Sequence, residues 1–198
     1  MELNDPILSR DEVYRRIGGC LDLISDPKIR DDVIELTRRA PEYFWIRPGS
    51  YSGYHNGTRY GLWHHTLKLC HTIDVLAPAK EAQGVMTKRD IDRALAAAIL
   101  HDQRKNGEDI ESEQTSNDHP RVMAELVREH SDLDELVARA IEEHMGGFDQ
   151  EPYPSSEIAD LVHTADMIAS ADTMGVGLPT PIPEELDSLV YTEVTDDE

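Results

Sequence analysis

The chain has 198 residues, of which 39% are hydrophobic, and this length and composition predict one main core rather than two independent domains. Its two cysteines, Cys20 and Cys70, are too few for a disulfide framework; their apolar surroundings predict reduced core thiols, with a single bridge left open. No apolar run is as long as a membrane helix requires, which is about 18 residues. The first residues, MELNDPILSRDE, do not resemble a signal peptide. We therefore expect a cytoplasmic protein with no membrane partner.

The charge is strongly asymmetric along the chain. The formal net charge is −21; residues 1–100 hold 14 acidic and 14 basic side chains, whereas residues 101–198 hold 26 and 5. A surface of this kind repels long polyanions, so we expect no binding to duplex nucleic acid. A small phosphorylated ligand is compatible with this charge, because a metal ion can supply positive charge locally.

The apolar residues recur with a period of 3.6, which predicts an all-α protein. The first helices after the N-terminus have breaks at Asp26-Pro27 and Pro41, and a long glycine-rich loop runs over 48–61. Two helix starts have the spacing of an N-cap, Thr87 with Asp90 and Ser131 with Asp134. The predicted helices span 10–24, 28–39, 41–47, 62–76, 88–102, 119–130, 132–144 and 156–173.

Several ionisable residues fall on or beside the apolar faces of these helices when each residue is rotated by about 100°. In the helix 62–76, His65 lies among leucines and isoleucine, whereas His64 and His71 point the opposite way. His163 rotates away from the apolar face of the last helix and is interpreted as a surface or supporting residue. The residues on or beside the core-facing stripes are His65, His101, Asp102, His119, His144 and Asp166.

Burying so many ionisable groups without partners would cost several kcal/mol for each group, so we expect them to pair or to bind a metal. Any one histidine of this kind is more often a hydrogen-bonded core or surface residue than a ligand. Four imidazoles and two carboxylates together suit Fe, Mn²⁺ or Zn²⁺. The joint pattern therefore favours one or two divalent transition-metal ions as cofactors.

The order of these residues resembles a known family. His65, then His101-Asp102, then Asp166 resembles the H…HD…D signature of the HD superfamily of metal-dependent phosphohydrolases, which are all-α. The dipeptide ends an alanine-rich helix, ALAAAILHDQRKNG, as it does in the family, and LVHTADMIAS resembles the family's terminal Ala-Asp element. His119 in DHPRVMAEL and His144 in AIEEHMGG are similar to the two additional histidines of members that hold two metals.

The resemblance implies a single-domain, HD-type helical bundle over 41–173, with N-terminal helices in 1–40 packed on it and an acidic tail over 174–198. It also implies the metal ligands His65, His101, Asp102, His119, His144 and Asp166. Two positions leave alternatives: His64 competes with His65, and Asp172 also faces inward by angle. The family commonly continues the HD dipeptide with Ile-Gly-Lys, whereas this chain has Gln103-Arg104-Lys105 and so loses the glycine.

The implied mechanism is metal-assisted hydrolysis of a phosphate ester or anhydride. Asp102 could bridge two metals as a catalytic residue. Lys105, three residues later, could neutralise phosphate oxygens if the helix continues, or be a solvated loop cation if it ends. Arg104 is a weaker candidate for the same contact with the substrate.

The loop over 48–61 is long for a compact domain, and such loops often carry function. Tyr54 and His55 could contact a base while Arg59 binds phosphate, which would suit a nucleotide substrate. The alternative is a tyrosine-rich cover that closes the helical bundle.

We therefore expect a metal-dependent phosphohydrolase acting on a nucleotide or a related small phosphate compound. The alternative from another class is an inactive, metal-stabilised helical module that binds a partner through its acidic second half. A nuclease subunit would need a basic groove, and the sparse positive charge argues against it. A metal site with an open position in a pocket would be catalytic, whereas a site closed by protein ligands would be structural.

Overall fold

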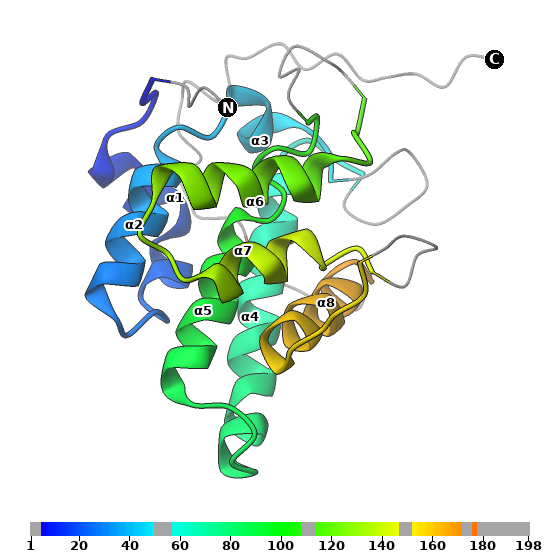
Figure 1. Ribbon diagram of the computed structural model, residues 1–198. Coiled ribbons are helices and arrows are strands. Elements are labelled where there is room, and N and C mark those ends of the chain that lie inside the picture. The colour runs from blue at the N-terminus through cyan, green and yellow to red at the C-terminus, as the bar shows by residue number, and fades with distance from the viewer. Residues whose placement is uncertain (1–4, 50–56, 108–113, 147–151, 172–175, 178–198) are drawn as a thin grey trace, which may run out of the picture.

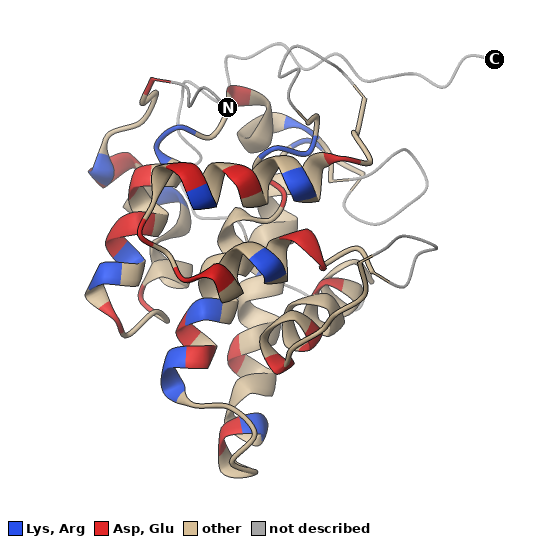
Figure 2. Ribbon diagram, in the orientation of Figure 1, with Lys and Arg blue, Asp and Glu red and all other residues tan. Residues whose placement is uncertain are grey.

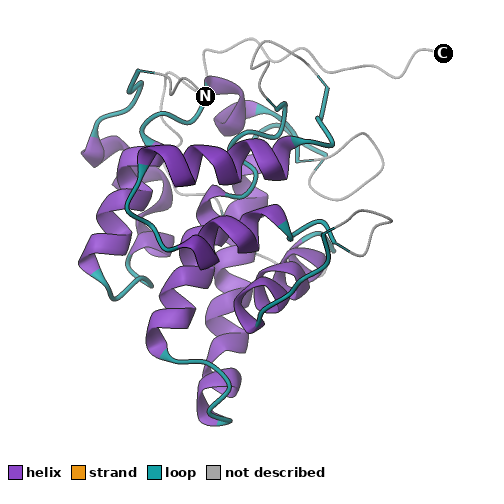
Figure 3. Ribbon diagram, viewed as in Figure 1, coloured by secondary structure: helices purple, strands orange, loops and turns teal. Residues whose placement is uncertain are grey.

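A computed structural model describes residues 5–49, 57–107, 114–146, 152–171 and 176–177. Over these residues the chain forms eight helices and no strand, which confirms the expected all-α fold (Figure 3). The helices are α1 (Arg10–Leu21), α2 (Pro27–Thr37), α3 (Glu42–Ile46), α4 (Gly61–Ala82), α5 (Lys88–Leu100), α6 (His119–His130), α7 (Glu135–Glu142) and α8 (Glu157–Ala169).

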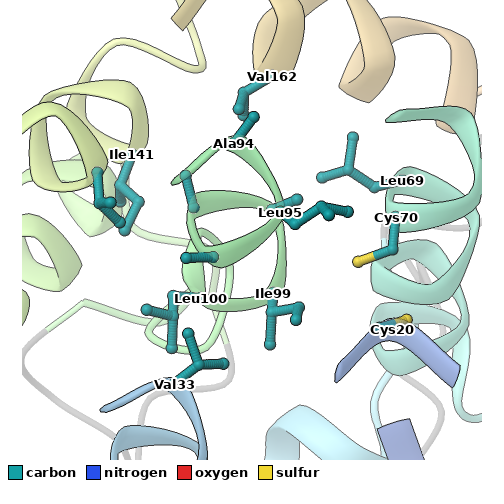
Figure 4. Packing of buried hydrophobic residues seen from close by; sticks show 14 of the residues in the cluster. Cys20, Val33, Leu69, Cys70, Ala94, Leu95, Ile99, Leu100, Ile141 and Val162 are labelled. Atoms are coloured by element: carbon teal, nitrogen blue, oxygen red, sulfur yellow. The ribbon is translucent and has the colours of Figure 1, made fainter. Parts of the chain in front are cut away.

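Helix α5 lies at the centre of the molecule and packs against α2, α4, α7 and α8 (Figure 1). Its run of alanines, Ala94 and Ala96–Ala98, is fully buried, and such small side chains let the neighbouring helices approach closely. Figure 4 shows Leu95 and Ile99 of α5 surrounded by side chains from the neighbouring helices. These labelled neighbours are Cys20, Val33, Leu69, Cys70, Ile141 and Val162. The last residue of α5, Leu100, is therefore still inside the core.

The two N-terminal helices are joined to this centre by a buried carboxylate. Asp92 of α5 accepts hydrogen bonds from the backbone N–H of Ser25, from its hydroxyl and from the N–H of Asp26. These bonds hold the turn between α1 and α2 against α5. The division of the chain into segments 1–40, 41–173 and 174–198 stays a prediction.

The start of α5 has the predicted capping box, whereas α7 begins later than predicted. The Thr87 side chain accepts from the N–H of Asp90, and the Asp90 carboxylate accepts from the N–H of Thr87. Ser131 instead follows the end of α6, where its hydroxyl donates to the carbonyl of Val127. Asp134 is the N-cap of α7, because its side chain accepts from the N–H of Leu136.

Other helix ends also differ from the predicted ones. Helix α4 continues past Pro78 to Ala82, and its last turn is held by Lys80, which donates to Glu157 and Asp160 of α8. Ala77 in this stretch is buried and α4 packs along α8, so packing between distant helices opposes the local signal of the proline. Helix α5 ends at Leu100, before the His101-Asp102 pair, and α8 ends at Ala169, four residues before the predicted end.

The two cysteines are free and buried, in agreement with the predicted core thiols. Among the described residues, no helix combines the length and the apolar character needed to cross a bilayer.

Candidate metal centre

Residues from five separate segments meet at the carboxyl end of α5. His65 comes from α4, His119 from the start of α6, and Asp166 from α8; the His101-Asp102 pair follows α5 and His144 follows α7. All of these side chains are buried, with exposed fractions between 0% for His101 and 6% for Asp166. The helical bundle therefore encloses a polar cluster at one end of its apolar core.

Three of the imidazoles are oriented in the same way by the backbone. Their Nδ1 atoms lie 2.8 Å from the carbonyl of Ala98 for His101, 2.6 Å from that of Ser116 for His119, and 2.6 Å from that of Ile141 for His144. A nitrogen that bonds to a carbonyl must carry the proton, so each ring directs its Nε2 lone pair into the cluster. Metal-binding histidines are commonly oriented by such a bond on the other nitrogen.

The cluster contains two compact groups that share one carboxylate. Ligand atoms of His65, His101 and Asp102 lie within 4.8 Å of one another, and so do those of Asp102, His119 and His144. The two oxygens of Asp102 divide between the groups. Oδ1 lies 3.0 Å from His119 Nε2 and 3.9 Å from His144 Nε2, whereas Oδ2 lies 3.4 Å from His101 Nε2. This arrangement is suited to a carboxylate that bridges two ions.

Asp166 reaches the cluster through His65. Its Oδ1 lies 2.8 Å from His65 Nε2, and it belongs to neither compact group. The competing residue Asp172 lies outside the described residues. His64 is half-buried, and its Nε2 contacts the carbonyl of Val176 rather than the cluster.

The residues fit a divalent metal ion because several buried polar atoms lack other partners. Nε2 of His101, Oδ1 of Asp102 and Nε2 of His119 are buried without an acceptable hydrogen bond among the described residues. Buried polar atoms in proteins are normally hydrogen-bonded, so atoms of this kind that face one another point to a bound ligand. Imidazole nitrogens and carboxylate oxygens are the donor set expected for Fe, Mn²⁺ or Zn²⁺.

The electrostatics of the cluster keep its carboxylates ionised. Burial opposes ionisation of Asp102, but the positive charges of Lys105 and His101 outweigh burial and hold the pKa of Asp102 well below its usual value. Burial likewise opposes ionisation of Asp166, and the hydrogen bond from His65 outweighs it and lowers the pKa of Asp166. Both side chains are therefore anionic, as metal ligands must be.

The histidines respond to burial in two different ways. Burial, reinforced by the charges of His101 and His119, lowers the pKa of His144 to about 3. Burial also opposes protonation of His101, but the nearby charge of Asp102 outweighs it and raises the pKa of His101. A metal ion would compete with the proton on His101, so the affinity for metal should fall in acid.

The lowered pKa of His144 predicts an acid-sensitive stability for the metal-free protein. Between about pH 6.5 and pH 4.5 the unfolded chain binds a proton at this imidazole that the folded chain does not bind. The free energy of unfolding should then fall with falling pH by on the order of 2 kcal/mol more in the wild type than in His144→Gln. His101 does not interfere in this pH range. Its pKa is raised in the folded state, so its contribution to the free energy of unfolding is present in acid and is lost only as the pH rises. Urea unfolding at both pH values measures the difference, and equal acid dependence of the two proteins would contradict it.

Lys105 lies beside the cluster although the helix ends before it. Residues 101–107 continue as tight turns, with the N–H of Lys105 bonded to the carbonyl of Asp102. The Lys105 Nζ lies 2.5 Å from Asp102 Oδ2, and the side chain is 19% exposed. The ammonium group is thus held at the edge of the polar cluster rather than free in solvent.

The loop residues expected to contact the substrate are only partly described. Tyr54 and His55 lie outside the described residues. The guanidinium of Arg59 lies 4.9 Å from the centre of the Tyr60 ring, and Tyr60 packs on the buried Trp63. Contacts of these residues with a substrate stay a prediction.

Two residues outside the predicted ligand set support the turn that carries His144, and of these only His163 is interpreted from the sequence as a surface or supporting residue. The Nδ1 of His163 lies 2.7 Å from the carbonyl of His144, so α8 fixes the turn that carries this imidazole. Glu143 accepts bonds from the N–H and the hydroxyl of Ser155 and fixes the same turn from the other side. The rotation of His163 away from the core was the only signal for these contacts.

Gly146 allows a close approach of two backbone segments just after His144. A Cβ at Gly146 would lie 2.5 Å from the carbonyl oxygen of Pro152, 2.7 Å from the Cα of Tyr153 and 2.9 Å from the Cδ of Pro154. Gly146→Ala should therefore lower the free energy of unfolding by roughly 1–3 kcal/mol, as overpacking does.

The control is Gly19→Ala in α1, where a Cβ meets nothing within 4 Å and alanine favours the helix. Chemical denaturation of both variants measures the difference. A Gly146→Ala protein as stable as the wild type would contradict the prediction.

The fold and this cluster together define a class of protein, a helical bundle with a buried centre of histidines and aspartates suited to divalent metal. The sequence profile of the HD domain matches residues 63–173, which is more than half of the chain. The chain therefore belongs to the HD superfamily, whose members are generally metal-dependent phosphohydrolases. Neither the curated proteins nor the solved structures compared with this chain gave a match.

Proposed function

We propose that this chain is an active metal-dependent phosphohydrolase that hydrolyses a small phosphate ester or anhydride, with a nucleotide as the favoured substrate. The proposed ligands are His65, His101, Asp102, His119, His144 and Asp166. The observation that carries the proposal is the pair of buried groups that share Asp102, with unpartnered nitrogen and oxygen atoms facing one another.

The bound ions would supply Lewis acidity, which activates water and neutralises the charge of the phosphoryl group. The protein's own contribution is to hold the ligands in fixed directions. The backbone carbonyls of Ala98, Ser116 and Ile141 hold three imidazoles in the required tautomer. Because Asp102 offers one oxygen to each group, it would serve as a ligand in both.

Lys105 is proposed to contact a phosphoryl oxygen of the substrate. Its ammonium group sits against Asp102, where it would meet an anion bound at the metals. Lys105→Met should then keep the metal while turnover falls by roughly a hundredfold to a thousandfold, as for loss of one group that stabilises the transition state.

The matched control is Lys28→Met, which removes an exposed lysine paired with Asp132 at 3.2 Å. Metal analysis and initial rates of phosphate release are measured for both proteins. A Lys105→Met enzyme with wild-type turnover would remove the lysine from the mechanism.

The charge distribution supports a small substrate rather than a nucleic acid. Described basic residues are largely engaged by carboxylates; for example, Arg121 pairs with Asp118 and Glu125, and Arg128 pairs with Glu135 and Glu142. Figure 2 shows both signs along α6, whereas α8 carries only acidic positions. A long polyanion would find little unpaired positive charge on these helices.

A reducing compartment is likewise proposed, supported by the two free thiols.

The test is metal analysis of the purified chain together with a phosphate-release screen over nucleotides, dinucleoside polyphosphates and model phosphodiesters. We expect bound transition metal and hydrolysis of at least one compound, with both lost on dialysis against a chelator. Retained metal without hydrolysis of any compound would contradict the proposal and favour an inactive, metal-stabilised module that binds a partner.

A further inference from the structure

Arg104 is a buried arginine that no carboxylate neutralises. It lies two residues after Asp102 and is 5% exposed. Among the described residues, no ion pair or hydrogen bond is found for its guanidinium, and its nitrogens are not among the fully enclosed side-chain atoms that lack a partner. Leaving a buried charge without a partner is costly, so a position of this kind needs an explanation.

A shortage of acidic residues does not explain it. The chain has 40 aspartates and glutamates. Arg93 of α5, for comparison, pairs with both Asp90 and Asp134. Exposed arginines on α6 also have two carboxylate partners each. Burial lowers the pKa of Arg104, and among its neighbours Tyr43 lies near enough to affect that pKa.

Tyr43 bonds to the turn that carries both Arg104 and the proposed metal ligand Asp102. Its hydroxyl accepts from the N–H of Asn106 at 3.2 Å and donates to the carbonyl of Gln103 at 3.4 Å. The second contact is long, so the hydroxyl hydrogen is available to a better acceptor. The guanidinium of Arg47 lies 5.2 Å from the centre of the Tyr43 ring and adds a second positive charge near Tyr43.

We propose that Arg104, with the hydroxyl of Tyr43, forms a subsite for a second phosphoryl group of the substrate, next to the group held at the metals. The proposal rests on the proposed function and narrows its substrate class to compounds with at least two phosphoryl groups. Lys105 faces Asp102 and serves the phosphoryl group at the metals, whereas its neighbour Arg104 binds the one that is not attacked. A guanidinium is suited to this role because its planar donors can bind two phosphoryl oxygens at once.

The test is calorimetric titration of the full-length, as-purified protein with inorganic pyrophosphate and with inorganic phosphate at constant ionic strength. Arg104→Met should bind pyrophosphate at least about tenfold more weakly than the wild type, while its affinity for phosphate changes less. Arg89→Met is the matched control, because Arg89 is an exposed arginine at the far end of α5. Tyr43→Phe should show a smaller loss in the same direction. Equal pyrophosphate affinity in Arg104→Met and Arg89→Met would overturn the subsite.

A stability measurement separates this role from a structural one. Without added anion, Arg104→Met should melt at or above the wild-type temperature, because it removes an uncompensated buried charge. Pyrophosphate should raise the melting temperature of the wild type more than that of the variant. A lower melting temperature combined with unchanged pyrophosphate affinity would overturn the proposal and make Arg104 structural.

The metal content of each sample distinguishes the two proposals. Unchanged pyrophosphate affinity in a metal-loaded Arg104→Met protein would overturn the subsite and leave the metal centre intact. Loss of affinity in Arg104→Met from samples that hold no metal would instead contradict the proposed hydrolase and support the anion subsite.

Discussion

Replacing Asp102 with alanine is expected to remove the bound metal and to lower the rate of phosphate release by more than about a hundredfold. Changes to supporting residues of metal sites already cost roughly 10- to 100-fold in affinity or activity, and Asp102 is a proposed ligand shared by both groups. Its loss would remove one oxygen from each group at once. It would also leave Lys105 and His101 without the carboxylate that they face.

Two variants control this experiment. Asp102→Asn keeps the shape of the side chain and removes its charge, so it should lose metal to a similar extent if charge is the essential property. Asp74→Ala removes an exposed carboxylate from α4 and should retain wild-type metal and turnover. Circular dichroism verifies that each protein is folded. A folded Asp102→Ala protein with full metal content and turnover would contradict the site.

Separate substitutions in the two groups should each remove one ion. The variants are His65→Gln and His119→Gln. His65 belongs only to the group with His101, and His119 belongs only to the group with His144. We expect the metal content to fall from about two ions per chain to about one in either variant, and to about none in the double variant. Turnover should fall by more than about a hundredfold in each, because each variant lacks one of the residues that would hold the metal that activates water.

The control is His71→Gln, which changes an exposed histidine on the outer face of α4. Metal content is measured by elemental analysis after gel filtration. One variant that lost both ions would show that the groups bind metal as a single unit, and unchanged content in both would contradict the assignment.

The helices and their inward faces could be predicted because the apolar period is local information. His65 lies inside the core and His71 outside it, as the rotation of about 100° per residue requires. The same periodicity placed His101 and Asp102 at the end of the predicted helix 88–102. In the structure they follow directly after α5. The start of α7 was misplaced because both Ser131 and Asp134 are good caps, and the choice depended on the contact of Ser131 with the preceding helix.

Features that depend on contacts between distant segments could not be predicted. The continuation of α4 past Pro78 lies where α4 packs along α8 and where Lys80 pairs with Glu157 and Asp160 of that helix. Lys105 stays beside Asp102 through tight turns rather than through a continued helix, which neither sequence alternative described. The burial of Arg104 without a carboxylate partner is visible only once the neighbouring segments are in place.

The central claim is that the two groups sharing Asp102 bind divalent metal, and anomalous diffraction from crystals grown with Mn²⁺ tests it most directly. We predict two anomalous peaks, one among His65, His101 and Asp102 and the other among Asp102, His119 and His144. Crystals that contain Mn²⁺ in the solvent but show no anomalous density at these residues would contradict the account.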